Sequence, residues 1–236
     1  YIQPICKNSS HTVVVGAGPA GLFASLILAR SGMEITLIER GKSVEERTKD
    51  VENFWNNRKL NTESNVQFFE EFVSHGAPEE ILYNSKPHIG TDRLKPTIRN
   101  IREEIIRLGG KVLFSTRLTD IKIKGNKVHS VMVESDGNEK EIFCDNVILA
   151  IGHSSRDTFR MIKNKGLMIE PKPFAVGARI EHLREKIDKS QYGDFYKEKK
   201  LGASVYKLNT HLENGRGVYT FCMCPGGVVV GAQSEE

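Results

Sequence analysis

The chain has 236 residues, of which 39% are hydrophobic and 27% are charged, as in ordinary globular proteins. A formal net charge of +4 is too small to indicate binding to nucleic acid, and no run approaches the roughly 18 apolar residues of a membrane span. Four cysteines in a chain of this length do not form a disulfide framework, and the first residues lack the pattern of a signal peptide. We therefore expect reduced thiols and a cytoplasmic location.

The strongest signal is a glycine motif that follows a short β-branched run. Residues 12–15 read Thr-Val-Val-Val, and Gly16-Ala-Gly18-Pro-Ala-Gly21 comes next, ahead of an apolar helix predicted over residues 22–31. Gly16 lets the chain turn off the strand, Gly18 lets a pyrophosphate approach the backbone, and Gly21 lets the helix pack close to the strand. The start of the helix then offers free N–H groups and a positive dipole end to the phosphates.

A second predicted strand, residues 34–38, ends on an acid at the position where dinucleotide-binding proteins carry one. Glu39 lies about 20 residues beyond the glycines, where a carboxylate accepts hydrogen bonds from ribose hydroxyls. The same carboxylate would repel a 2′-phosphate, so we expect an unphosphorylated adenosine. Strand, tight turn, helix, strand and acid together predict a dinucleotide site; a glycine-rich turn that serves only packing is the alternative.

The next elements follow from turn and capping signals. Ser43 and Glu46 have the spacing of a capping box that opens a helix, and residues 53–68 are polar enough to form a loop. Beyond them we predict a helix at 69–75, a short strand at 81–83, an amphipathic helix at 90–108 and a strand at 111–117.

From residue 118 to residue 143 the pattern becomes short strands separated by glycine-containing turns, which indicates an antiparallel meander. Its place in the chain makes it a crossover between two parallel strands. Residues 146–151 are apolar throughout, as in a strand buried on both faces, and Gly152 ends them. We expect Asp157 to cap the helix that follows.

After residue 170 the character changes again. We predict strands at 174–180, 203–208, 218–224 and 228–231 and a helix at 183–189. The fold class is therefore α/β, with a Rossmann-like domain at residues 1–170 that contains a three-stranded antiparallel meander crossover. A partial, mostly antiparallel substrate region follows at residues 171–236.

These motifs carry a resemblance to a known family. Gly16-Ala-Gly-Pro-Ala-Gly21, the strand that ends at Glu39, the meander and Val147-Ile-Leu-Ala-Ile-Gly152 resemble flavoproteins of the glutathione-reductase-like FAD/NAD(P)-binding superfamily. Four further stretches resemble a narrower bacterial family of FAD-dependent dehydrogenases whose substrates are largely unassigned. These stretches are residues 59–68, 86–92, 177–182 and 219–227.

The sequence departs from that family in two places. Family members carry a glycine-rich segment after residues that correspond to Phe68, whereas Phe69 follows directly here, which implies an omitted segment at 68/69. Family members also continue well beyond residues that correspond to 236, which implies that the substrate region is truncated.

The resemblance implies FAD as cofactor, with NADH or NADPH as a possible reductant. It assigns the pyrophosphate to the glycine motif, the adenosine ribose to Glu39, the adenine to backbone groups at Leu118, and further packing to the strand after the meander. The implied cofactor-binding residues are Gly16, Gly18, Pro19, Ala20, Gly21, Glu39, Arg40, Arg47, Leu118, Ala150 and Gly152.

The sequence does not identify catalytic residues. Cys222 and Cys224 are spaced C-x-C, which suits a buried structural pair better than a redox couple, and nothing nearby completes a metal site, so we expect no metal. Arg179 and His182 could anchor an anionic substrate or serve a structural role. His153 is equally a candidate site residue and a loop residue.

The leading hypothesis is a cytoplasmic FAD-dependent oxidoreductase that acts on a small molecule, with no nucleic-acid or membrane partner. The alternatives are a flavin-binding sensor or scaffold without turnover, a flavin-dependent RNA-modifying enzyme, and a dehydrogenase that uses only a nicotinamide cofactor. The weak net charge and the absence of a basic stripe argue against the RNA-modifying enzyme.

Overall fold

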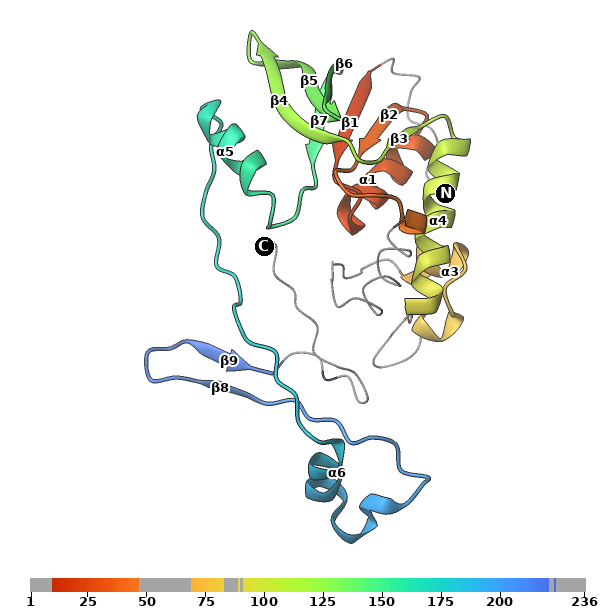
Figure 1. Cartoon of the computed structure of the whole chain (residues 1–236), viewed down its shortest axis with the longest axis vertical. Helices are drawn as coiled ribbons and strands as arrows, with labels where there is room; N and C mark the ends of the chain where they lie inside the picture. The colour runs from red at the N-terminus through yellow and green to blue at the C-terminus, as the bar shows by residue number, and fades with distance from the viewer. Residues whose placement is uncertain (1–9, 47–68, 83–88, 90, 221–222, 224–236) are drawn as a thin grey trace. The chain divides into compact units, whose positions relative to one another are not determined.

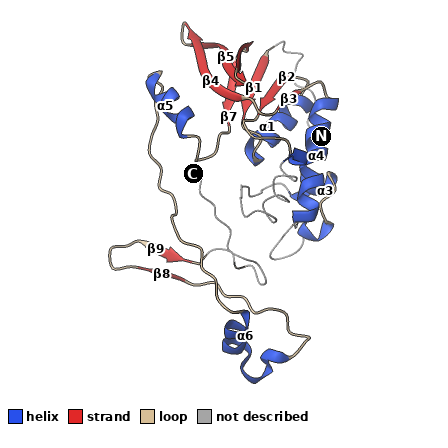
Figure 2. Cartoon of the chain, viewed as in Figure 1, coloured by secondary structure: helices blue, strands red, loops and turns tan. Residues whose placement is uncertain are grey.

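The computed structural model describes residues 10–46, 69–82, 89, 91–220 and 223. These residues belong to two compact units that divide between Glu170 and Pro171. Each unit has its own secondary structure (Figure 1, Figure 2). Arg47, the junction after Phe68 and the strand predicted at 228–231 lie outside the described residues.

The first unit is built on a parallel sheet whose strands follow the order β3-β2-β1-β7 (Figure 1). The central strands are β1 (His11–Val15) and β2 (Glu34–Ile38), which pair in parallel with Val14 opposite Leu37. Their β-branched side chains suit a strand that is buried on both faces, and both strands are buried over four residues. The outer strands are β3 (Lys111–Leu113) and β7 (Asn146–Leu149).

Side chains alternate between the two faces of the sheet, so neighbouring valines of β1 enter different cores. Val14 packs in a core formed with the helices α1 (Pro19–Arg30), α3 (Phe69–Ser74) and α4 (Thr91–Arg107). Val13 and Val15 pack in the other core, against the meander.

The meander consists of β4 (Arg117–Lys124), β5 (Lys127–Ser135) and β6 (Asn138–Phe143), which pair antiparallel in that order. Gly125 and Asn126 form one tight turn and Asp136 and Gly137 form the other, all four with positive φ. This is the conformation that two-residue hairpin turns require. In the chain the meander joins β3 to β7, which confirms the predicted crossover.

Four expectations for the first unit were wrong in detail. Residues 79–82 form a 3₁₀ turn, η1 (Glu79–Leu82), rather than the start of a strand, because the N–H of Ile81 bonds to the carbonyl of Pro78. The strand predicted at 111–117 ends at Leu113, and Ser115 has a φ of 47°. Such a φ breaks the extended backbone.

The third wrong expectation is that β7 is buried on both faces. This strand lies at the edge of the described sheet, where it pairs with β1 alone and is half-exposed. The fourth wrong expectation is that Asp157 caps the helix α5 (Arg156–Asn164), because Ser155 occupies its N-cap position. Asp157 lies inside the first turn instead, where it pairs with Arg40.

The second unit contains α6 (Arg184–Tyr192), the 3₁₀ turn η2 (Gly193–Lys197) and a hairpin of β8 (Asn209–His211) and β9 (Gly217–Tyr219). Asp188 organises it: its carboxylate accepts hydrogen bonds from the Ser204 N–H at 2.8 Å and the Ser204 hydroxyl at 2.7 Å. The described residues at 174–180 and 203–208 form no strand, because no described strand pairs with them, and a strand needs a partner for its backbone groups.

Candidate dinucleotide-binding site

A cavity of about 980 Å³ opens at the carboxyl ends of β1, β2 and β7. Ligands of open α/β sheets bind at this edge. The cavity wall comes from the glycine loop, the end of β2, α4, the segment after β3, and the stretch between β7 and α5. Its lining includes Gly16, Ala17, Gly18, Pro19, Ala20, Glu39, Arg40, Lys42, Lys95, Arg102, Phe114, Leu118, Ala150, Gly152, Ser154 and Thr158.

The three glycines of the loop differ in what surrounds them. Gly16 has a φ of 100°, and a Cβ there would lie 2.4 Å from the carbonyl oxygen of Ala150. A Cβ on Gly21 would lie 1.8 Å from the carbonyl oxygen of Gly16, so the helix can approach the loop only without a side chain. A Cβ on Gly18 would meet no atom within 4 Å. Gly18 is therefore bare backbone that faces the open cavity.

The start of α1 leaves its positive end available to an anion. Gly18 occupies the N-cap position without a side-chain cap, Pro19 follows, and the first turn carries no acidic residue. The first N–H groups of a helix have no partner within the helix. A pyrophosphate fits this position by charge and by the space above Gly18.

Glu39 is held at the other side of the glycine loop. Its Oε2 accepts a hydrogen bond from the N–H of Ala17 at 2.7 Å, and its Oε1 accepts one from the N–H of Gly41 at 2.7 Å. The backbone thus fixes the direction of the Glu39 carboxylate beside the glycine loop. A carboxylate at this position is the group that accepts hydrogen bonds from ribose hydroxyls, so the residues present fit an adenosine diphosphate group.

Two arginines at the cavity are paired with acids. Arg102 donates to both oxygens of Glu45 at 2.8 Å, and its guanidinium lies 5.7 Å from the centre of the Phe114 ring. The hydrogen bond from Arg102, with help from Arg99, holds the pKa of the Glu45 carboxyl far below its usual range. This fixes the short helical turn after Lys42, where Ser43 and Glu46 form the predicted capping box.

The second pair joins Arg40 to Asp157. The Nη2 of Arg40 lies 2.7 Å and 3.0 Å from the two oxygens of Asp157. Burial opposes ionisation of this carboxyl, but hydrogen bonds from Arg40 and from the N–H of Thr158 outweigh it. The pKa of Asp157 therefore lies below its usual range. Sequence reasoning placed Asp157 in a cap and missed this role, for which no local pattern exists.

The structure brings together nearly all the residues that the sequence predicts for the cofactor. Gly16, Gly18, Pro19, Ala20, Glu39, Arg40, Leu118, Ala150 and Gly152 line the cavity. Gly21 packs behind the loop, and Arg47 lies outside the described residues. Lys95, Arg102 and Phe114 also line the cavity and were not predicted. The helical spacing of α4 indicated only that it has an apolar face.

The other candidate residues lie elsewhere. His153 is exposed and is not part of the cavity wall. Arg179 and His182 belong to the second unit, where His182 Nε2 lies 2.8 Å from the hydroxyl of Tyr206. Cys222 and Cys224 lie outside the described residues.

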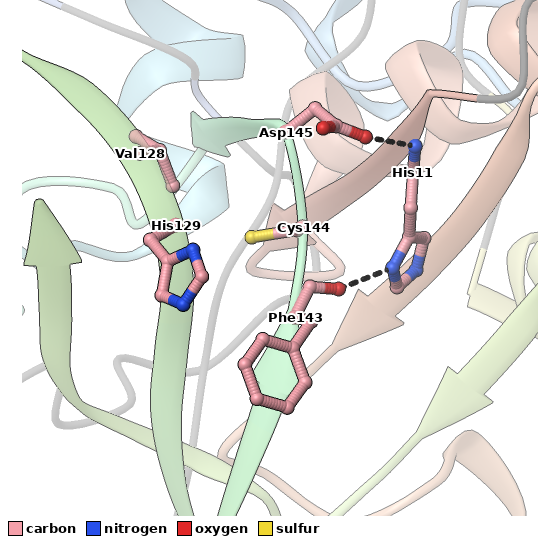
Figure 3. A pocket seen from close by; sticks show the side chains of 6 residues that line it. All are labelled: His11, Val128, His129, Phe143, Cys144 and Asp145. Carbon is pink, nitrogen blue, oxygen red and sulfur yellow. Dashed lines mark hydrogen bonds between the residues drawn. The ribbon is translucent and has the colours of Figure 1, made fainter. Parts of the chain in front are cut away.

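A smaller cavity, of about 340 Å³, lies beside the start of β1 (Figure 3). The carbonyl of Phe143 accepts a hydrogen bond from His11 Nδ1 at 2.7 Å, so His11 Nε2 is left to bond with the hydroxyl of Thr36 at 2.9 Å. Burial raises the pKa of the neighbouring Cys144 thiol to about 11, which removes it as a nucleophile near neutral pH. These groups join the end of the meander to the sheet.

No group of three or more histidine, cysteine, aspartate or glutamate side chains in the described ranges is arranged to hold a metal ion. Within the same ranges, no helix has the length and apolar character to cross a membrane.

Two solved structures illustrate the likeness to known proteins, and both are distant in sequence. The structure of Thermovibrio ammonificans THI4 has a TM-score of 0.47 at 19% identity, over 68% of this chain and 64% of that one. A flavoprotein/dehydrogenase from Cytophaga hutchinsonii has a TM-score of 0.42 at 19% identity, over 66% of this chain and 42% of that one.

Comparison with sequences is more specific. An uncharacterized protein of Clostridium beijerinckii is 48% identical over 96% of this chain, and the chain spans 47% of that relative's length. Residues 173–236 match the model of the FAD-dependent protein, C-terminal domain-like family. Residues 10–170 match the pyridine nucleotide-disulphide oxidoreductase model, which confirms the predicted superfamily and the α/β fold. The chain belongs to the pyridine nucleotide-disulphide oxidoreductase family, with FAD as its cofactor.

Proposed function

We propose that the cavity binds the ADP half of FAD and that the whole protein is a dehydrogenase, which transfers a hydride between the flavin and a small, anionic substrate. The assignment of the cavity to the ADP half of FAD rests on one observation. The bare backbone of Gly18 at the start of α1 and the fixed carboxylate of Glu39 border the same cavity, joined through the N–H of Ala17. These are the two contacts that a dinucleotide site provides, one for the pyrophosphate and one for the adenosine ribose.

Each group of residues around the cavity has a role in FAD binding that follows from its chemistry. The free N–H groups at the start of α1 hold the pyrophosphate, and Glu39 accepts hydrogen bonds from the ribose. Leu118 and Ala150 supply apolar surface and backbone groups beside the adenosine. FAD, when bound, supplies the two-electron chemistry, and the protein positions it and keeps water away.

The substrate class rests on residues after position 170. Arg179 and His182 offer positive charge and hydrogen-bond donors in a region that matches an FAD-dependent C-terminal family. A carboxylate or phosphate group suits an arginine, because the guanidinium can bind two of its oxygens at once. The proposal includes NADH or NADPH as the electron donor, the cytoplasm as compartment, and no nucleic-acid or membrane partner.

The test begins with the full-length natural protein and its visible absorption as isolated. We expect a flavin spectrum, release of free FAD on denaturation, and bleaching of the bound flavin when NADH or NADPH is added without oxygen. A colourless protein that binds NADH but cannot be reconstituted with FAD would overturn the proposal. A bound flavin that neither donor reduces, with no substrate turned over, would favour the sensor or scaffold. Retention on RNA at moderate salt would favour the RNA-modifying enzyme.

A further inference from the structure

The end of β2 carries two residues with opposite preferences for a nucleotide. Glu39 suits a ribose with a free 2′-hydroxyl, whereas an arginine beside that position accommodates a 2′-phosphate. A free guanidinium binds phosphate through two parallel hydrogen bonds. Glu39 predicts an unphosphorylated adenosine, but an unpaired Arg40 beside it would offset the repulsion of a 2′-phosphate and weaken that preference.

The tertiary structure pairs Arg40 with a carboxylate. The Nη2 of Arg40 donates to both oxygens of Asp157, which lies 117 residues later in the chain, in the first turn of α5. A second arginine, Arg117, has its Nη1 3.8 Å from the same carboxylate, and its Nη2 lies 2.5 Å from Glu134. Two arginines and two acids thus form one charge cluster, and Arg40 is its member that lines the cavity.

The other end of α5 has a comparable ion pair that stands outside the cavity. Lys165 Nζ lies 2.7 Å from Asp120, on β4. Neither residue lines the cavity. The two ion pairs anchor opposite ends of the same helix, but only the pair at the start of α5 contains a residue that lines the cavity. Variants that break each pair in turn therefore distinguish the effect of anchoring α5 from the effect of pairing Arg40.

We infer that Asp157 is a specificity-determining residue of the dinucleotide site. By holding Arg40 it withholds that guanidinium from a 2′-phosphate, and with Glu39 it reserves the site for an ADP group whose ribose is unphosphorylated. NADP(H), which shares the rest of the ADP half, is thereby excluded from the FAD site. This inference rests on the proposed function, in which the cavity holds the ADP half of FAD.

The test compares two probes that differ only in the 2′-phosphate, 5′-AMP and adenosine 2′,5′-bisphosphate. Each is titrated against the full-length protein loaded with FAD, and flavin fluorescence reports displacement. Low ionic strength is used because both Arg40 and Asp157 are more than two-fifths exposed and salt would screen them. We expect Asp157→Asn to improve the affinity for the bisphosphate relative to AMP by roughly five- to tenfold.

Three further variants test the assignment. Asp120→Asn breaks the control pair and should leave the ratio of affinities unchanged. Arg40→Gln combined with Asp157→Asn should restore the wild-type ratio, because the released group is Arg40. Arg40→Gln alone should also leave the ratio unchanged, since Arg40 is already occupied. That last result does not depend on whether Asp157→Asn folds.

The outcomes separate the inference from the proposed function. If AMP displaces FAD but Asp157→Asn leaves the ratio unchanged, the inference is wrong and the FAD site stands. A loss of bisphosphate affinity in Arg40→Gln alone would also overturn it, because Arg40 would then already serve a 2′-phosphate. If the wild-type protein holds no FAD, or if AMP does not displace it, the proposed function itself fails.

Discussion

The N–H of Ala17, in the middle of the glycine loop, donates a hydrogen bond of 2.7 Å to the carboxylate of Glu39 at the end of β2. This hydrogen bond links the loop that would face the phosphates directly to the acid that would face the ribose. A preformed site loses less entropy when a ligand binds.

Replacement of Glu39 by alanine should weaken FAD binding more than tenfold, because it removes both the ribose acceptor and the brace on the loop. A hydrogen bond to a charged group contributes about 1.5–3 kcal/mol, which corresponds to roughly ten- to a hundredfold in affinity. The measurement is the dissociation constant of FAD from the full-length protein, compared between Glu39→Ala and wild type. Glu34→Ala, at the exposed start of the same strand, is the control and should bind FAD normally. Equal affinity in Glu39→Ala and wild type would contradict the assignment.

Alanine substitutions at two glycines should distinguish an effect on FAD binding from an effect on folding stability. Gly21→Ala should lower the melting temperature, because the new Cβ would lie 1.8 Å from the carbonyl of Gly16. That clash outweighs the gain of about 1 kcal/mol that alanine brings to a helix. Gly18→Ala has open space around it and should keep the wild-type melting temperature while FAD affinity falls. If Gly18→Ala binds FAD as wild type does, the phosphates do not approach at this position.

A partly buried ion network joins the helices on one face of the sheet. Glu104 accepts hydrogen bonds from Arg30 Nε at 2.9 Å and from His75 Nε2 at 2.9 Å, and His75 is 5% exposed. We expect Glu104→Ala to destabilise the protein by about 1–3 kcal/mol, since it leaves these donors without an acceptor. Thermal unfolding should show a fall of roughly 2–4 °C per kcal/mol. Glu103→Ala, exposed on the same helix, should change little.

The same network should lose its contribution in acid. The hydrogen bond from Arg30, against the effect of burial, lowers the pKa of Glu104 below its usual value. A carboxyl with a lowered folded pKa stabilises fully above its unfolded pKa, about 4.3, and the stabilisation disappears as the pH falls through the folded pKa. The stability gap between wild type and Glu104→Gln should therefore narrow from pH 5 to pH 3. A gap that stayed constant over that range would show that ionised Glu104 contributes nothing.

Cys144 should resist alkylation in the folded protein. Burial raises the pKa of its thiol to about 11, with the charge of Asp145 adding to the effect. At pH 8 only about 0.1% would be thiolate, against roughly a quarter for a thiol with the ordinary pKa near 8.5. Peptide mapping after a short exposure to iodoacetamide should find Cys144 unmodified in native protein and modified in urea. Rapid labelling of the native protein would contradict the burial that raises this pKa.

Local sequence determined the features that need only neighbouring residues. The strand, glycine loop, helix and acid of residues 12–39 lie in one continuous stretch, and the positive-φ turns at Asn126 and Gly137 belong to two-residue hairpins. Backbone geometry and turn chemistry act over a few residues, so pattern alone predicted the α/β fold, the meander, the glycine loop and Glu39. The resemblance to a flavoprotein family supplied the other predicted residues that line the cavity.

Tertiary structure decided what depends on partners far away in the chain. It paired Arg40 with Asp157 and Arg102 with Glu45, and it placed β7 at the edge of the described sheet. It also left residues 174–180 without a strand partner among the described residues. A charge shows its partner, and a strand its neighbour, only when the folded backbone brings distant segments within hydrogen-bonding distance. For that reason the sequence predicts the glycine loop and the acid of the dinucleotide site, and only the fold shows which charged residues around the cavity already have partners.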